Sequence, residues 1–330
     1  LRLDFPPFME PLDLAVDLLK RGRLVAFPTE TVYGLGARAD MPEAAAGIFH
    51  AKNRPNFDPL IVHVPDAKSA MEWAVFDERA TKLASRFWPG PLTLVLPRRY
   101  RGGNPRIPDL VTSGLDSVGI RVPAQPMALE LLRRVGLPIA APSANPFGYV
   151  SPTTAQHVRS GLGDRVDLVL DGGPCEVGVE STIVDLCSQR PRLLRPGGLP
   201  RELLEQELGC ALEYAGFAPP VRTEAPGMME SHYSPGIPVE IFEDPSSLRT
   251  RSVELGGRCV VVTESVISDV ECVEAIALGE GPAMAVNLFA TLRRLDDPAY
   301  GRILALLPRP EGLGLAVRDR LFRAAKSRVG

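Results

Sequence analysis

A proline-rich stretch without apolar periodicity interrupts this chain at residues 215–238. It reads AGFAPPVRTEAPGMMESHYSPGIP and contains five prolines, a composition typical of an interdomain linker or a loop that crosses a surface. At about 150 residues per domain, a chain of 330 residues is also expected to form two domains. We therefore predict one domain over 1–214, a linker over 215–238 and a smaller domain over 239–330.

Short apolar strands alternate with amphipathic helical patterns over the first 214 residues. Strands are predicted at Leu24–Phe27, Leu60–Val64, Leu92–Leu96, Val118–Val122, Pro138–Ala141, Asp167–Leu170 and Thr182–Asp185. Helices are predicted around 12–21, 77–87, 126–135 and 153–161. This mixture, joined by connections rich in proline and glycine, favours an α/β or α+β domain.

The segment after the linker has a more regular alternation. Strands are predicted at Val239–Phe242, Arg258–Thr263, Glu274–Leu278 and Ile303–Leu307, with helices near 282–295 and 314–326. Strands that alternate with helices are typical of a parallel sheet. We expect a small Rossmann-like domain here, and an α/β fold for the chain as a whole.

Charge and cysteine content exclude several classes of protein. The net charge is −3, with 45% hydrophobic residues, so neither intrinsic disorder nor a basic nucleic-acid-binding domain is expected. Five cysteines without a C-x-x-C pair argue against a zinc site or a disulfide framework. No apolar run approaches a membrane span, and residues 1–11 lack the pattern of a signal peptide. We expect a cytoplasmic location.

Common nucleotide-binding and hydrolase motifs are absent or imperfect. No lysine follows a glycine, so the P-loop pattern is excluded. The near match to a dinucleotide fingerprint at Gly34–Ala39 comes six residues after its strand, too late for a tight strand-to-helix turn. We favour a turn with positive φ there. The patterns G-x-S-x-G and H-E-x-x-H do not occur, which removes two common hydrolase signatures.

Polar residues instead gather in proline-stiffened segments beside predicted strands, at 27–34, 52–55 and 140–146. Ligands of open α/β sheets bind at strand ends. Lys52 supplies a point charge and Arg54 a planar fork, a pairing suited to an oligophosphate. The alternative for this pair is a solvated surface position.

Each of the other segments also has a plain structural explanation. Ser143 and Asn145 are compatible with an ordinary turn, and His63 with a histidine of the core. Residues 178–182 are compatible with the start of a strand, and residues 195–198 with the cap of an edge strand. The combination of all of them with Lys52 and Arg54 in one chain favours a binding site.

Taken in order, these segments resemble the signatures of the YrdC/Sua5 family of threonylcarbamoyl-AMP synthases. The resemblance rests on Phe27–Gly36, Lys52/Arg54, Trp88–Thr93, Ser143/Asn145, Gly178–Thr182 and Leu194–Gly197. The segment Ala225–Pro235 resembles the linker before the extra C-terminal domain of the long, Sua5-type members. The resemblance implies a YrdC-like domain with a twisted mixed sheet, followed by a smaller Rossmann-like Sua5 domain.

The family resemblance also implies an activity. The expected enzyme is a nucleotidyltransferase that makes threonylcarbamoyl-AMP and pyrophosphate from L-threonine, bicarbonate or CO2, and ATP. The product would serve the N6-threonylcarbamoyl modification of adenosine 37 in tRNA, through a downstream transferase machinery and with at most a weak tRNA contact. Mg²⁺ is expected as a cofactor held mainly through the ATP phosphates.

Site residues follow from the same resemblance. It assigns ATP binding to Lys52, Arg54, Ser117, Ser143, Asn145, Ser151, Arg195 and Tyr233, with Lys52 and Arg54 as the catalytic pair. It assigns threonine binding to Thr31, His63, Arg121, Ala141 and Ser181, with Arg121 as the fork for the carboxylate. It assigns no protein ligand to a metal.

Two other readings compete with this one. A double-stranded RNA-binding or ribosome-maturation protein without adenylation activity is one alternative, although the near-neutral first domain weighs against it. The related carbamoyl-transfer domain of hydrogenase maturation is the other. Those proteins carry C-x-x-C cysteine pairs, which this chain lacks.

Overall fold

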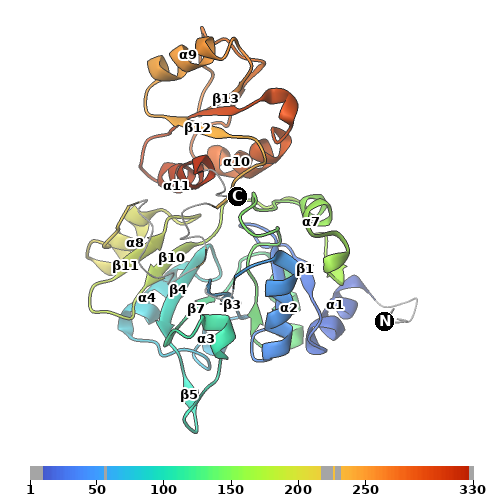
Figure 1. Cartoon of the computed structure of the whole chain (residues 1–330). Coiled ribbons are helices and arrows are strands. Elements are labelled where there is room, and N and C mark those ends of the chain that lie inside the picture. Colours follow the sequence, from blue (N-terminus) through green and yellow to red (C-terminus); the bar gives the residue numbers. More distant parts are fainter. Residues whose placement is uncertain (1–9, 56–57, 217–225, 227–231, 327–330) are drawn as a thin grey trace.

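The computed structural model describes residues 10–55, 58–216, 226 and 232–326. It contains two main sheets, each with its own helices (Figure 1). Of the predicted linker, residues 217–225 and 227–231 lie outside the described residues. No helix in the described ranges is long and apolar enough to cross a bilayer. All five cysteines are free thiols.

The larger sheet has nine strands in the order β11-β10-β4-β7-β3-β8-β2-β1-β9. They are β1 (Val25–Phe27), β2 (Gly34–Arg38), β3 (Ile61–His63), β4 (Leu92–Pro97), β7 (Ser117–Arg121), β8 (Ile139–Ala140), β9 (Leu168–Val169), β10 (Thr182–Asp185) and β11 (Arg192–Arg195). Parallel pairs such as β3 with β7 stand beside antiparallel pairs such as β4 with β7. The predicted mixed sheet is thus confirmed. A small hairpin of β5 (Tyr100–Arg101) and β6 (Asn104–Pro105) projects from it.

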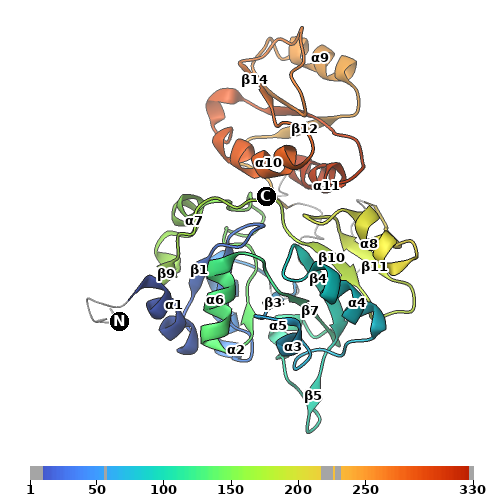
Figure 2. The same cartoon turned by 180° about the vertical axis from the view of Figure 1, so that it is seen from behind.

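Helices cover both faces of this sheet (Figure 2). They are α1 (Pro11–Lys20), α2 (Pro42–Lys52), α3 (Ala67–Ala70), α4 (Glu78–Phe87), α5 (Asp109–Thr112), α6 (Pro126–Val135), α7 (Ala155–Leu162) and α8 (Arg201–Leu208), with a 3-10 turn at Gly163–Arg165. Because successive strand residues face opposite sides, Val25 and Phe27 pack with α1 and α6. Ala26, between them, joins the larger core on the other face.

The smaller sheet is wholly parallel, in the order β12-β15-β13-β14. Its strands are β12 (Val239–Phe242), β13 (Val260–Thr263), β14 (Glu274–Ala277) and β15 (Ile303–Leu306). Its helices are α9 (Pro245–Glu254), α10 (Pro282–Arg294) and α11 (Gly314–Ala325), with a 3-10 turn at Pro298–Tyr300. The predicted Rossmann-like architecture is confirmed.

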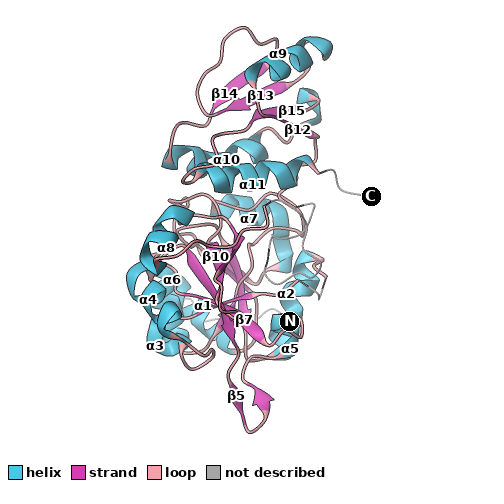
Figure 3. Cartoon of the chain, turned by 90° about the vertical axis from the view of Figure 1, so that its left-hand side faces the viewer, coloured by secondary structure: helices cyan, strands magenta, loops and turns pink. Residues whose placement is uncertain are grey.

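Helices α10 and α11 lie between the small sheet and the larger domain, and α9 covers the opposite face (Figure 3). The apolar core under α10 and α11 includes Leu288 and Val317 from these helices. It also includes Val150 and Val179 from the larger domain. The two domains therefore share one apolar cluster.

The prediction of a positive-φ turn at Gly34–Ala39 is wrong, because Gly34–Arg38 is the extended strand β2. A Cβ on Gly36 would stand 2.7 Å from Cε1 of Phe27. The glycine is therefore required by close packing across the sheet rather than by backbone conformation.

Candidate functional site

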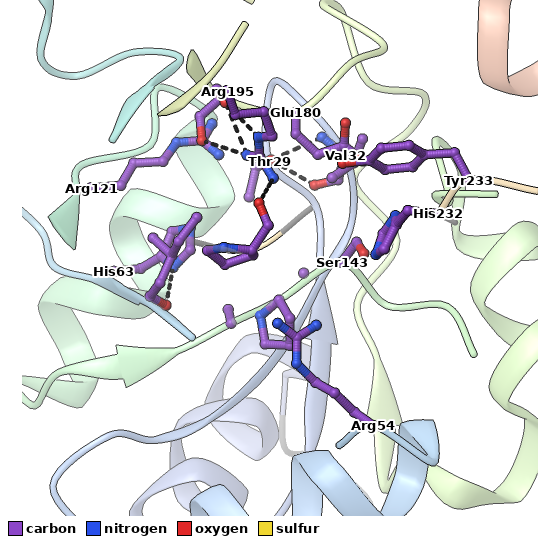
Figure 4. Close-up of a pocket in the computed structure, with 16 residues that line it drawn as sticks. Thr29, Val32, Arg54, His63, Arg121, Ser143, Glu180, Arg195, His232 and Tyr233 are labelled. Atoms are coloured by element: carbon purple, nitrogen blue, oxygen red, sulfur yellow. Dashed lines mark hydrogen bonds between the residues drawn. The ribbon is translucent and has the colours of Figure 1, made fainter. Parts of the chain in front are cut away.

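A cavity opens at the strand ends of the larger sheet (Figure 4). Its walls come from segments far apart in sequence. The lining residues are Thr29, Val32, Gly34, Arg54, Ile61, His63, Arg121, Ala141, Pro142, Ser143, Glu180, Ser181, Arg195, Pro226, His232 and Tyr233. The predicted site residues that it brings together are Arg54, His63, Arg121, Ala141, Ser143, Ser181, Arg195 and Tyr233.

Strand register accounts for part of this convergence. His63 ends β3 and Arg121 ends the parallel strand β7, where the two residues are direct partners. Ala141 follows β8, and its N–H donates to the carbonyl of Ile61 (2.9 Å). Parallel strands bring their carboxyl ends to one edge of a sheet, so His63 and Arg121 lie side by side at that edge.

Lys52 and Arg54 are both buried, so the solvated surface pair is ruled out. Lys52 ends α2, and Asn53 turns the chain in the left-handed conformation (φ 51°). The Lys52 Nζ donates to the carbonyls of Ser143 and Asn145, 2.5 Å from each. Lys52 therefore holds the 143–145 loop from behind and does not itself line the cavity. Burial, with the nearby Arg54 charge, holds the pKa of Lys52 well below its usual range.

Arg54 lines the cavity and is paired with a buried carboxylate. Its Nη2 lies 2.8 Å from Oδ2 of Asp58 and donates to the carbonyl of Pro59 (2.9 Å). Burial lowers the pKa of Arg54, and the Asp58 charge opposes this. Asp58 is fully buried, so this pair is fixed in place rather than solvated.

Arg121 is also paired with a buried carboxylate. Its Nη2 donates to Oε1 of Glu30 at 2.6 Å, and its Nε donates to the carbonyl of Gly90 at 3.3 Å. The second oxygen of Glu30 accepts the N–H of Ala124 (2.9 Å). Glu30 therefore occupies part of the fork that we expected to bind a carboxylate. Sequence reasoning did not single out Glu30.

Thr29, rather than Thr31, lines the cavity. The two hydroxyl oxygens lie 2.7 Å apart, and Thr29 donates to the carbonyl of Val32 (2.6 Å). Thr31 is fully buried. Thr31 therefore contacts a residue that lines the cavity, Thr29, but does not line the cavity itself.

His63 lies between the apolar core and the cavity. Its ring meets the Phe27 ring edge-on, with centroids 6.2 Å apart. Burial lowers the pKa of His63 to about 3, assisted by the charge of Arg121. His63 is neutral at physiological pH and is a weak proton acceptor.

The opposite wall is built on β10 and β11. Ser181 Oγ lies 2.7 Å from the hydroxyl oxygen of Thr93. The Arg195 guanidinium donates to the carbonyls of Ser181 (2.9 Å) and Pro226 (3.1 Å). Burial lowers the pKa of Arg195.

Three further predicted residues lie outside the cavity lining. Asn145 donates to the carbonyls of Pro146 and Tyr149, each at 2.8 Å, and so shapes the loop. Ser151 donates to Oε1 of Glu180. Ser117 begins β7, whereas Arg121 ends it. The structure does not bring Ser117 to the cavity, because four residues of extended strand, about 13 Å, separate it from Arg121.

His232 and Tyr233 reach the cavity from the segment before the smaller domain. Their rings stand 4.1 Å apart, and the Tyr233 ring stacks on Phe289 of α10 at 5.5 Å. Tyr233 takes a positive φ of 61°. Sequence reasoning named Tyr233 but not His232 as a site residue.

The charges of this cavity suit an anionic ligand. Among the described lining residues there are three guanidinium groups, from Arg54, Arg121 and Arg195, and one carboxylate, that of Glu180. The carboxylates of Asp58 and Glu30 pair with Arg54 and Arg121 from outside this lining. Planar guanidinium forks suit phosphate and carboxylate groups. Among the described residues, no group of three histidine, cysteine or acidic side chains could hold a metal ion.

Comparisons with known proteins agree with this geometry. Residues 17–197 match the Sua5/YciO/YrdC family model described as "Telomere recombination", and residues 201–326 match the "Threonylcarbamoyl-AMP synthase, C-terminal domain" model. Threonylcarbamoyl-AMP synthase of Pyrococcus abyssi is 42% identical, with 96% of this chain and 94% of the relative covered. The Bacillus subtilis synthase is 40% identical, covering 96% and 93%.

A solved structure extends the likeness to three dimensions. The crystal structure of P. abyssi Sua5 complexed with L-threonine has a TM-score of 0.88 and 40% identity, covering 95% of this chain and 94% of that chain. These matches give no support to the alternative of an RNA-binding protein without adenylation activity. With matches to both domains and near-complete relatives, the chain belongs to the Sua5/YrdC family of threonylcarbamoyl-AMP synthases.

Proposed function

We propose that this chain condenses L-threonine, bicarbonate and ATP into threonylcarbamoyl-AMP with release of pyrophosphate. The observation that carries the proposal is that Arg54, Arg121 and Arg195 line one cavity (Figure 4). A triphosphate and an amino-acid carboxylate together need such a set of cations. Family membership supports the same reaction.

The substrates divide between the two ends of the cavity. The nucleotide phosphates would lie toward Arg54 and Arg195, beside the loop held by Lys52. Threonine would lie beside His63, Arg121 and Ser181, with its carboxylate on the part of the Arg121 fork that Glu30 leaves open. This arrangement brings the threonine amine toward the α-phosphate.

The reaction needs no covalent enzyme intermediate. The threonine amine adds to CO2 derived from bicarbonate and loses a proton, which gives N-carboxy-threonine. A carboxylate oxygen of that carbamate then attacks the α-phosphorus in line, and the bond to the pyrophosphate oxygen breaks. Positioning and charge neutralisation dominate such a step. His63 binds rather than acts as the base, because a pKa of about 3 makes it a weak proton acceptor.

Mg²⁺ is proposed to enter with the nucleotide. Glu180, the one carboxylate among the described lining residues, already accepts hydrogen bonds at both of its oxygens. The described residues therefore offer no protein cage, which suits an ion that keeps several waters and binds phosphate oxygens. Its chemistry would be to neutralise charge on the leaving pyrophosphate.

The biological setting is an expectation of the same proposal. We expect the adenylate to be consumed by a transferase that modifies adenosine 37 of tRNA, in the cytoplasm. The near-neutral net charge of −3 makes any direct tRNA contact weak.

Pyrophosphate release tests the proposal. We would incubate the full chain with ATP, Mg²⁺ and bicarbonate, and add each amino acid in turn. Release that depends on threonine, with much less for serine, is the expected result. The extra methyl of threonine limits the discrimination to about 10–200-fold. Folded protein that releases no pyrophosphate in response to threonine would refute the proposal.

A further inference from the structure

Helix α11 of the smaller domain places a fully buried arginine against the cavity wall. The side chain of Arg320 is 0% exposed. Its Nε donates to Oε2 of Glu180 at 2.8 Å, and its Nη1 donates to the carbonyl of Pro196 at 2.7 Å. Glu180 itself lines the cavity. A residue 140 positions away thus determines how this carboxylate is held.

Helix α10 fixes the other oxygen of the same carboxylate through Ser151. Arg293 donates to the carbonyls of Val150 (2.5 Å) and Ser151 (3.2 Å). The hydroxyl of Ser151 donates to Oε1 of Glu180 at 2.5 Å. Both oxygens of Glu180 are therefore held by groups that belong to, or are bound by, the smaller domain.

The backbone beside Glu180 also rests on α10. Gly178 has a φ of +78°, and a Cβ there would lie 2.4 Å from Cα of Val286. Only glycine permits this approach of two main chains. The segment that carries Glu180 is thus pressed against the smaller domain.

A buried row of charges keeps Arg320 in place. Its Nη1 donates to Oδ2 of Asp319 (2.8 Å), whose Oδ1 accepts from Nε of Arg323 (3.0 Å). The Arg320 guanidinium also lies over the Tyr233 ring, 5.0 Å from its centroid. Connected buried ion pairs and hydrogen bonds fix one geometry.

The charge of Glu180 already acts on Arg195 through space, although no hydrogen bond joins the two side chains. Burial alone would raise the pKa of Glu180, but the charges of Arg320 and Arg195 hold it below its usual range. Arg195 lines the same cavity, and no carboxylate of the described residues forms a direct ion pair with it. A carboxylate released from Arg320 would therefore compete for Arg195 with an anionic ligand.

We infer that Arg320 is a positioning residue of the proposed reaction, which holds the Glu180 carboxylate in its bonds to Arg320 and Ser151, so that Glu180 does not pair directly with Arg195 and Arg195 can bind nucleotide phosphate. The inference rests on the proposed function. It gives the smaller domain a defined task at the active site, carried by one side chain of α11.

A double-substitution cycle tests this assignment on the full chain. We would compare the wild type, Arg320→Gln, Glu180→Gln and the double variant, measuring KM for ATP in threonine-dependent pyrophosphate release and the Kd for ATP by calorimetry. Arg320→Gln should raise both constants about tenfold or more, with a smaller change in kcat, because a charged competitor for Arg195 has been released. The double variant should return to within about threefold of the wild type, since the competitor is gone.

Arg318→Gln is the matched control. Arg318 lies on the same helix but pairs with Glu243 of the smaller domain (2.6 Å), so both constants should stay at the wild-type value. If Arg320→Gln does not fold, Arg320→Lys replaces it, with an expected increase of about threefold that Glu180→Gln again reverses. The double variant with Arg320→Gln should fold, because it removes both partners of one buried ion pair and leaves Asp319 paired with Arg323.

Two results would overturn the assignment: wild-type ATP constants in Arg320→Gln, or a double variant as impaired as Arg320→Gln. The second is what a merely structural role of Arg320 produces. A wild-type chain that binds ATP but releases no pyrophosphate would refute the proposed function alone. The calorimetric cycle would still decide the role of Arg320.

Discussion

The Lys52 ammonium is buried and donates to two loop carbonyls, with its pKa held low by burial and by Arg54. Bound nucleotide phosphate would add negative charge near this group to that of Asp58 and Glu180. We predict that Lys52→Met lowers kcat/KM for pyrophosphate release about a hundredfold. The free energy of unfolding should fall by about 1–3 kcal/mol, because two buried carbonyls lose their donor.

Lys82→Met serves as the control for that substitution. Lys82 is half exposed and lies 3.7 Å from Glu207 on the surface. Exposed ion pairs contribute about 0–1 kcal/mol, so both activity and unfolding should stay close to wild type. Wild-type kcat/KM in folded Lys52→Met would contradict the role of Lys52 at the phosphates.

His63 gives a prediction about stability and pH. Its pKa is lowered to about 3 in the folded protein, against about 6.5 in an unfolded chain. Between these values only the unfolded state binds the proton, so the stability that neutral His63 provides is present above about pH 6.5 and falls as pH decreases. We predict that the stability difference between wild type and His63→Gln shifts by about 2 kcal/mol against the wild type from pH 7 to pH 5.

Urea unfolding of both proteins at the two pH values measures that shift. All other titrating groups are common to wild type and variant, so their contributions cancel in the difference. A difference that does not change with pH would show that His63 titrates normally in the folded protein.

Part of the cavity lining consists of residues that the sequence had singled out. Arg54 and Arg195 lie in the quoted motifs and Arg121 was assigned by the family resemblance, and all three line one cavity. Glu180 lies in the Gly178–Thr182 motif but was given no role, because its partner Arg320 is distant in the chain. Lys52 was named, but its burial was not predictable, since K-x-R is equally common on surfaces.

Strand β2 shows how packing overrides a local pattern. The Gly-Leu-Gly-Ala sequence suggested a turn, yet Gly36 lies in the sheet because Phe27 occupies the space of its missing side chain. We predict that Gly36→Ala lowers the free energy of unfolding by about 1–3 kcal/mol through overpacking. Denaturant unfolding measures the loss.

Gly119 of β7 is the matched control, because an added Cβ would meet its nearest neighbours at 3.4 to 4.0 Å, which is ordinary contact. Gly119→Ala should show no loss of stability, since a less flexible unfolded chain offsets small adjustments. Equal stability of the two variants would contradict the packing explanation for Gly36.

Elements with clear apolar periodicity were predicted, and those without it were missed. The strand over Thr182–Asp185 was predicted at its observed bounds, because its apolar residues are buried on both faces. Helix α2 was missed because its alanine-rich sequence Pro42–Lys52 carries no strong amphipathic pattern. Tertiary contacts, with Ile48 and Phe49 in the core, specify it instead.

At the scale of the whole molecule, the cavity joins the two domains. Tyr233 and His232 line it from the segment before the smaller domain, and α10 and α11 share an apolar core with the larger one. We predict one cooperative unfolding transition, which ATP and threonine shift as a unit. At a free concentration of 100 Kd, one ligand should add about 2.7 kcal/mol.

Unfolding followed by separate probes tests this coupling, with Trp73 and Trp88 reporting on the larger domain and far-ultraviolet circular dichroism reporting on both. Coincident curves, with and without ligands, are expected. Two separate transitions would contradict the coupling of the domains, if ligands shifted only the transition that the tryptophans report. The shared core depends on long-range contacts that no local pattern reveals.

Isotope labelling tests the central claim most directly. We would incubate the full chain with ATP, Mg²⁺, L-threonine and ¹³C-bicarbonate, and measure the mass of the nucleotide product. The account predicts threonylcarbamoyl-AMP that carries the ¹³C label and forms in equal amount to pyrophosphate. An unlabelled threonyl-adenylate, or no adenylate from a folded chain that binds ATP, would contradict it.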